Sequence, residues 1–218
     1  MTAVLPPAFF FRFAIPVMFQ PDIPKKQGDL LKLPEACRLP QVNLLENQIP
    51  FGDLRLAWND EGLGVSIEVR GKKMPVSSHA EEPATSDGLQ IWIDTRNTQT
   101  IHRASRFCHH FCFVPVTNEK NSNPVARELA INRAREERKL ADSDDLIVQS
   151  KILKDGYRLE AWLPAKSLVG YDPNANPQLG FYSLIQDAEL GRQFLTVGDE
   201  FPFAEDPSVW STLELVSD

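Results

Sequence analysis

The sequence predicts an all-β fold, a two-sheet antiparallel β-sandwich that forms one domain over residues 1–218. Two segments carry the prediction, residues 86–96 and residues 155–164, because in each an Asp-Gly pair opens a run of alternating apolar and polar side chains. A period of two is the pattern of a half-buried strand. A hydrophobic content of 42% in 218 residues is enough to bury one sizeable core.

In both runs the apolar side chains share one phase, which is the phase expected to face the core. Trp92 and Trp162 fall in the opposite phase, so each strand is expected to carry one tryptophan on its less apolar, half-exposed face. The core-facing residues are Leu89, Ile91 and Ile93 in the first run, and Tyr157, Leu159, Ala161 and Leu163 in the second.

The N-terminal residues are expected to form an opening strand. Phe9, Phe11 and Phe13 alternate there with Phe10, Arg12 and Ala14. This apolar stretch does not have the pattern of a targeting signal, since no basic region precedes it and prolines interrupt it. Residues 21–40 are Pro-rich and residues 79–86 are polar, so both segments are expected to be loops.

Two hairpins are expected where pairs of apolar runs flank a short turn. The first turn is Asn59-Asp60-Glu61-Gly62, and the second is Lys154-Asp155-Gly156. Both contain glycine beside an acidic residue, and these residue types favour tight turns. The paired segments are 53–58 with 63–70 and 147–153 with 157–163, and two further strands are expected at 179–187 and 211–216.

Residues 123–140 leave two interpretations open. Asn123-Pro124 could begin a helix, and the Ala, Leu, Arg and Glu that follow favour helical structure. The apolar stripe of such a helix would be poor. One short helix in this segment therefore stays an alternative to irregular or extended structure.

Charge and cysteine content restrict the function classes. The formal net charge of −7 argues against a nucleic-acid binder or a protein that binds anionic membranes, because such proteins concentrate Lys and Arg. No run reaches the roughly 18 apolar residues that a membrane helix needs. Three cysteines without an export signal predict free thiols and a cytoplasmic location.

Four motifs in order carry a resemblance to a known family. They are Asp87 to Asp94, Asp155-Gly156-Tyr157 to Pro164, Leu179-Gly180-Phe181 to Asp187, and Asp206-Pro207-Ser208 before Leu213-Glu214-Leu215. Over residues 54–216 this pattern resembles the family 9 carbohydrate-binding modules and the wider DOMON-like sandwiches. The resemblance implies a jelly-roll-like sandwich of about ten strands, ligand recognition by aromatic side chains of loops and sheet, and structural calcium in some members.

The chain departs from the resemblance at the positions that would bind sugar. Sugar-binding members look as though they hold a terminal sugar between two tryptophans, and here those positions are Ala84 and Ala204, with Gln90 in place of a strand acid. Each missing ring face removes about 1.3 kcal/mol of stacking. We therefore expect a carbohydrate or related small ligand at an altered site. The candidate ligand-binding residues are Trp92, Trp162, Gln90, Glu160, Phe203 and His110.

Residues 106–113 place cysteine and histidine on one strand. Cys108, His110 and Cys112 would share a face, with about 13 Å between the two cysteines. That distance excludes a disulfide and a shared zinc ion. Buried thiols beside a hydrogen-bonded histidine are the expected arrangement.

Two other functions stay open. A protein-interaction module would use Trp92 and Trp162 on half-exposed sheet faces. A hydrolase would need a cleft in which His109 or His110 meets two carboxylates, although none of the common catalytic motifs is present. The acidic segments 60–61, 142–145 and 205–206 could supply calcium ligands, but solvated loops are the expected structure.

Overall fold

The computed structural model describes residues 14–41, 49–115 and 123–217. Within these ranges the fold is all-β with a few 3₁₀ turns and no α-helix, which confirms the predicted fold class. None of the helices in the described ranges is long and apolar enough to cross a membrane. The opening strand expected at Phe9 to Phe13 lies outside the described residues.

Eleven strands follow one another along the described chain. They are β1 (Ala14–Phe19), β2 (Gly52–Asn59), β3 (Gly62–Arg70), β4 (Gly88–Asp94), β5 (Cys108–Val114), β6 (Val125–Leu129), β7 (Ile147–Leu153), β8 (Gly156–Pro164), β9 (Gln178–Asp187), β10 (Gly191–Phe194) and β11 (Ser211–Val216).

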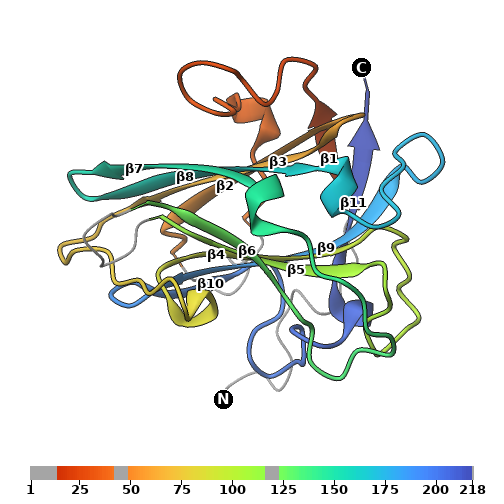
Figure 1. The fold of residues 1–218 in the computed structure, drawn as a ribbon. Coiled ribbons are helices and arrows are strands. Elements are labelled where there is room, and N and C mark those ends of the chain that lie inside the picture. The colour runs from red at the N-terminus through yellow and green to blue at the C-terminus, as the bar shows by residue number, and fades with distance from the viewer. Residues whose placement is uncertain (1–13, 42–48, 116–122, 218) are drawn as a thin grey trace.

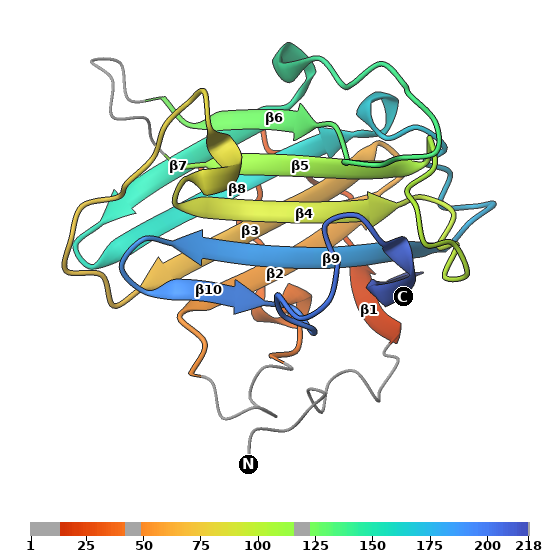
Figure 2. The same cartoon turned by 90° about the horizontal axis from the view of Figure 1, so that it is seen from below.

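The strands form one sheet that folds back on itself. Its order is β6-β5-β4-β9-β11-β1-β2-β3-β8-β7, and β10 pairs with β9. All pairs are antiparallel except those of β1 with β11 and β2. Figures 1 and 2 show the two resulting layers, which we call the β4 layer (β6, β5, β4, β9 and β10) and the β3 layer (β2, β3, β8 and β7).

Both expected hairpins are confirmed. Strand β2 pairs with β3 up to Asn59 and Gly62, and β7 pairs with β8 up to Leu153 and Gly156. The two Asp-Gly pairs of the sequence also have a shared physical cause. A Cβ at Gly88 or Gly156 would clash with a carbonyl of the neighbouring strand, so only glycine permits pairing at the start of β4 and β8.

The core lies between the two layers. The side chains expected to face it are all buried in the structure, and Tyr157, Leu159, Ala161 and Leu163 have no exposed area. The period-two pattern of β4 and β8 thus assigned the core-facing phase correctly.

The helix considered for residues 123–140 is wrong. Residues 125–129 form strand β6, which pairs with β5 so that Ala126 lies opposite Phe113. Ala126 and Glu128 alternate as buried positions along this strand. Pairing with a neighbouring strand therefore outweighs the helical propensity of the segment.

Candidate functional site

The six candidate ligand-binding residues separate into two groups on opposite sides of the molecule. Gln90, Trp92 and His110 lie on the outer face of the β4 layer, because Trp92 pairs with His110 across β4 and β5. Phe203 contacts the same face from the loop after β10. Glu160 and Trp162 lie on β8, in the other layer.

The first group forms an aromatic cluster, which we call the Trp92 cluster (Gln90, Trp92, His110, Cys112, Tyr182 and Phe203). The Trp92 and His110 rings stack with centroids 4.2 Å apart. Phe203 meets Trp92 edge to face at 5.4 Å and stacks on Tyr182 at 4.6 Å. Such geometries are favourable beyond the area they bury.

The expectation that Trp92 is half-exposed is wrong, since only 2% of its surface is accessible. The loop between β10 and β11 returns over this face and brings Phe203 with it. The indole Nε1 of Trp210 donates to the Phe203 carbonyl at 2.7 Å, and the Tyr182 hydroxyl donates to the Val197 carbonyl. The first bond joins two parts of the loop, and the second joins the loop to β9 of the sheet.

Ala84 and Ala204, where sugar-binding members would have tryptophans, lie beside residues of the Trp92 cluster. The side-chain amide of Gln90 donates to the Ala84 carbonyl at 2.9 Å. Ala84 therefore contacts the cluster through its backbone. Ala204 is exposed and directly follows the buried Phe203. The ring that covers Trp92 therefore comes from the chain itself.

Burial controls the protonation of the cluster. It lowers the pKa of His110 to about 4, so the ring is neutral at pH 7. Gln90 Oε1 lies 3.0 Å from His110 Nε2. Burial also raises the pKa values of Cys108 and Cys112 to about 12. All three cysteines are buried free thiols, and Cys108 and Cys112 stay protonated at neutral pH.

His109 belongs to a different environment. Its Nδ1 lies 2.7 Å from Glu128 Oε1, and Arg138 also binds Glu128, with Nη1 3.1 Å from Oε2. Burial lowers the pKa of His109 against the raising effect of Glu128. Within the described residues, neither His109 nor His110 meets two carboxylates in a cleft, which is the arrangement that the hydrolase hypothesis requires.

Trp162 is 3% exposed, so its expected half-exposure is also wrong. The Pro-rich loop of residues 21–40 packs on the outer face of the β3 layer and buries it. Leu30, Leu31 and Leu33 form a small apolar cluster with Trp162. The protein-interaction hypothesis thereby loses both tryptophans that supported it.

Glu160 holds this loop from below. Its carboxylate accepts the backbone N–H of Lys32 at 2.9 Å and that of Leu31 at 3.3 Å. Beside the loop lies a cavity of about 350 Å³, which we call the charged groove. Its lining residues are Asp29, Lys32, Leu33, Asp53, Arg55, Ser66, Ile67, Glu68, Arg158 and Glu160.

Of the groove residues, only Glu160 is among the six candidates that the sequence predicts. The available signal was the polar phase of β2, β3 and β8, which carries Asp53 and Arg55, then Ser66 and Glu68, then Arg158 and Glu160. A polar phase is ordinary for a solvated sheet face. Its meaning depends on the registers of three strands that are remote in sequence.

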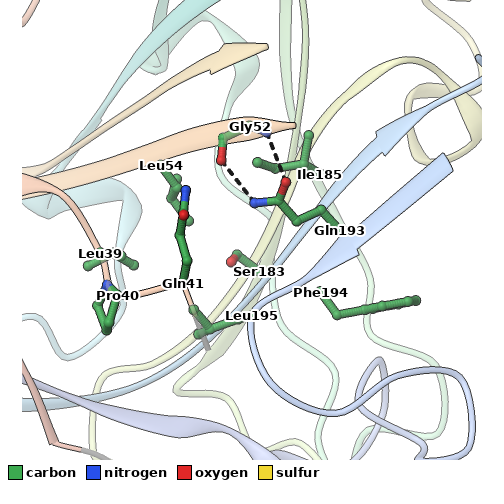
Figure 3. A pocket seen from close by; sticks show the side chains of 10 residues that line it. All are labelled: Leu39, Pro40, Gln41, Gly52, Leu54, Ser183, Ile185, Gln193, Phe194 and Leu195. Carbon is green, nitrogen blue, oxygen red and sulfur yellow. Dashed lines mark hydrogen bonds between the residues drawn. The ribbon is translucent and has the colours of Figure 1, made fainter. Parts of the chain in front are cut away.

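Figure 3 shows a much smaller cavity, of about 20 Å³, beside Gly52 and Gln193. The Gln193 amide accepts the backbone N–H of Phe51 and of Gly52 and donates to the Gly52 carbonyl, at 2.8 to 2.9 Å. This side chain joins the start of β2 to β10. The cavity is too small for a ligand, and the contact is structural.

A third cavity, of about 290 Å³, lies beside β5 and β6. Its lining is mainly apolar, with Ala104, Leu129 and Ile131 among its residues, and it includes the protonated Cys108. None of the six candidate ligand-binding residues lines it.

Among the described residues, no group of three or more His, Cys, Asp or Glu side chains is arranged so that it could hold a metal ion. The two buried carboxylates that do converge, Asp87 and Asp187, bind the Lys72 ammonium at 3.1 and 2.6 Å. A cation already neutralises them, so this pair does not fit Ca²⁺. Asp206 instead accepts the Ser208 N–H at 2.9 Å.

A comparison with protein-family models matches the sequence to one family. The family model described as "Carbohydrate family 9 binding domain-like" matches residues 35–218. No curated protein matches the chain.

Two solved structures share the fold, both of a carbohydrate-binding module family 9 from Caldicellulosiruptor kristjanssonii. The complex with cellotriose is 17% identical, with a TM-score of 0.60 over 94% of this chain and 95% of that chain. The complex with glucose is 18% identical, with a TM-score of 0.58 over 94% and 97%. At these identities the likeness concerns the fold.

Proposed function

The chain belongs to the carbohydrate family 9 binding domain-like family, and from this premise we propose that it is a non-catalytic domain that binds carbohydrate at an altered site. The structures with the same fold hold cellotriose and glucose, which supports a sugar as the class of ligand. The domain architecture alone does not identify the site.

The observation that carries the altered site is the position of Phe203. Its ring stands against Trp92 at 5.4 Å, His110 stacks on Trp92, and Trp92 is buried. A sugar gains binding energy from an aromatic ring only if it can cover an exposed face. In the Trp92 cluster these faces are already covered by protein.

The chemistry of the histidines supports a non-catalytic role. His110 is neutral and stacked in the cluster, and His109 is fully buried against Glu128 and Arg138. A general acid or base must reach the substrate. Protonated, buried cysteines are also poor nucleophiles. The cytoplasmic location stays a prediction, for which the three free thiols are the support.

The test is a titration of the protein with glucose, cellotriose and xylo-oligosaccharides. Binding is measured by calorimetry and by NMR. We expect no heat beyond dilution at submillimolar ligand and small NMR shifts at millimolar ligand, since stacking is missing. A micromolar isotherm that disappears in Trp92→Phe, with the fold retained by circular dichroism, would restore the unaltered site. No shifts with any of the sugars at tens of millimolar would reject carbohydrate binding.

A second candidate, a protein-interaction domain, keeps one observation in its favour. Ile147 and Ile152 are 45% and 52% exposed on β7, which ends the strand order of the sheet. An edge strand with apolar side chains can pair with another chain. Light scattering would then show dimers that Ile152→Lys converts to monomers, whereas a monomeric parent chain would argue against pairing through β7.

A further inference from the structure

The outer face of the β3 layer carries a two-by-three array of polar side chains. Strand pairing places Asp53 opposite Glu68, and Glu68 opposite Arg158, in one row. Arg55, Ser66 and Glu160 form the parallel row. Neighbouring strands are about 4.8 Å apart, so the array has the dimensions of a small ligand.

The loop of residues 21–40 borders this array on one side. Glu160 binds the backbone N–H groups of Leu31 and Lys32, and Gln149 Oε1 accepts the N–H of Leu30 at 2.7 Å. Lys32 has a φ of 49°, which is uncommon for a residue other than glycine. Such backbone conformations concentrate at ligand-binding segments.

The side chains of the array are held in place by ion pairs. Arg158 Nε and Nη2 both donate to Glu68 Oε2, at 2.9 and 2.6 Å. Arg55 Nε donates to Asp53 Oδ1 at 2.9 Å, and its Nη1 donates to the Leu33 carbonyl at 3.0 Å. A preorganised set of donors and acceptors loses little entropy when a ligand binds.

Unused hydrogen-bonding capacity faces the cavity. A carboxylate accepts up to about four hydrogen bonds, and those of Asp53 and Glu68 are shared mainly with arginines. Ser66 Oγ makes no hydrogen bond within the described ranges of the chain. The cavity volume of about 350 Å³ falls in the range of small-molecule sites.

The charges indicate the class of ligand. Four carboxylates line the groove (Asp29, Asp53, Glu68 and Glu160) against three cations (Lys32, Arg55 and Arg158). This near balance favours neither polyanions nor polycations. Neutral hydroxyl groups both donate and accept hydrogen bonds, so they can pair with carboxylates and guanidinium groups alike.

From these observations we propose that the charged groove binds a neutral polyhydroxylated ligand, a sugar ring, by hydrogen bonds and without aromatic stacking. The proposal rests on the proposed carbohydrate-binding function and assigns its site to the β3 layer. No aromatic side chain lines the groove among the described residues, so millimolar affinity is the expected outcome.

The experiment maps the sugar on the full chain by ¹H–¹⁵N NMR titration with glucose and cellotriose. The expected shifts lie at Lys32, Ser66 and Glu68. Arg158→Ala should weaken binding about tenfold. Arg192→Ala is the matched control, since Arg192 is also paired, with Asp199, and its side chain is 37% exposed against 38% for Arg158.

A second variant keeps the test independent of folding. Lys32→Gly suits the backbone conformation at this position and removes only the side chain, so it should leave stability unchanged or higher while it weakens binding about threefold. Unaltered affinity in both Arg158→Ala and Lys32→Gly would overturn the proposal.

The outcomes separate this proposal from the proposed function. Sugar-dependent shifts confined to the Trp92 cluster would reject the groove and retain carbohydrate binding. No shifts anywhere with glucose, cellotriose or xylo-oligosaccharides would reject both. Saturation of the groove by glycine betaine or inorganic phosphate, with no response to sugars, would reject the ligand class.

Discussion

The outer faces of the two layers are both covered by loops, but the covers differ. On the β4 layer the loop after β10 inserts the ring of Phe203 against Trp92. On the β3 layer the loop before β2 turns its backbone toward the sheet and binds Glu160 through two N–H groups. One cover fills the space above the strands, and the other leaves a cavity of about 350 Å³ beside it.

The two loops also differ in some of their backbone hydrogen bonds. The loop over Trp92 satisfies its own backbone, as in the bonds from Phe203 N–H to the Phe201 carbonyl at 2.8 Å and from Glu205 N–H to the Pro202 carbonyl at 3.0 Å. It can therefore present an apolar ring to the sheet. A loop whose N–H groups face the strands needs acceptors below it, and those acceptors make a polar surface.

The largest expected effect is the loss of the buried ion pairs of Lys72, which connect the β3 layer with the β4 layer. Lys72 follows β3 of one layer, and it binds Asp87 before β4 and Asp187 at the end of β9 in the other. Lys72→Met leaves two buried carboxylates unpaired, which should cost about 3 to 5 kcal/mol in urea unfolding. Burial lowers the pKa of Lys72, but its hydrogen bonds with Asp187 and Asp87 outweigh this effect. The pKa of Lys72 is therefore raised above its usual value.

The raised pKa gives this prediction a pH dependence. The stabilisation by Lys72 is complete below the ordinary lysine pKa and is lost as the pH rises through the higher folded-state value. Arg70→Met is the control, since it removes solvent-accessible ion pairs with Asp155 and Glu68 and should change stability little. Equal unfolding midpoints for the two variants would show that the buried pair does not join the layers.

The next effect tests the aromatic cover. Phe203→Ala should destabilise the chain by about 3 kcal/mol and admit water to Trp92, which should shift the tryptophan emission to the red and increase quenching by acrylamide. Phe201→Ala is the control, because Phe201 is only partly buried in the same loop. Unchanged emission in Phe203→Ala would contradict the covering role of this ring.

The sequence predicted the part of the fold that depends on local pattern. Alternation identified β4 and β8 with their core-facing phases, and turn residues identified both hairpins. The strand β6 was not recognised, since Ala126 to Leu129 favour a helix locally and become a strand only through pairing with β5.

The exposure of Trp92 and Trp162 was beyond what the pattern can report. A period of two assigns a side chain to a face, but it does not say whether a remote loop covers that face. Phe203 and the leucines before β2 provide these covers. The charged groove was missed for a related reason, because its rows exist only through the registers of β2, β3 and β8.

A smaller effect on stability is expected from the protonation of His110, which lies on the outer face of the β4 layer. The folded-state pKa of His110 is about 4, against 6.5 for the free side chain. A lowered histidine pKa means that stability is complete above pH 6.5 and is lost as the pH falls toward 4. Between pH 7 and pH 5 we expect a loss of about 2 kcal/mol from this residue.

The measurement is urea unfolding at several pH values above 5, where most carboxylates stay ionised. His110→Gln should flatten the profile but leave a remaining slope, because the pKa of His109 is also lowered by burial. An identical slope in parent and variant would mean that His110 titrates normally and that the cluster is open to solvent.

The smallest expected effect concerns the polar cover of the β3 layer. Glu160→Gln keeps one acceptor oxygen and removes the charge, so it should cost about 1 kcal/mol, and the Leu31 and Lys32 amides should exchange hydrogen about fivefold faster. Glu189→Gln is a matched control, since Glu189 accepts two backbone N–H groups, from Lys73 and Met74, at an exposed position. Unchanged exchange at Leu31 in Glu160→Gln would show that the remaining contacts of the loop, including those of its leucines with Trp162, are sufficient to hold it. The charge of Glu160 would then have no role in holding the loop.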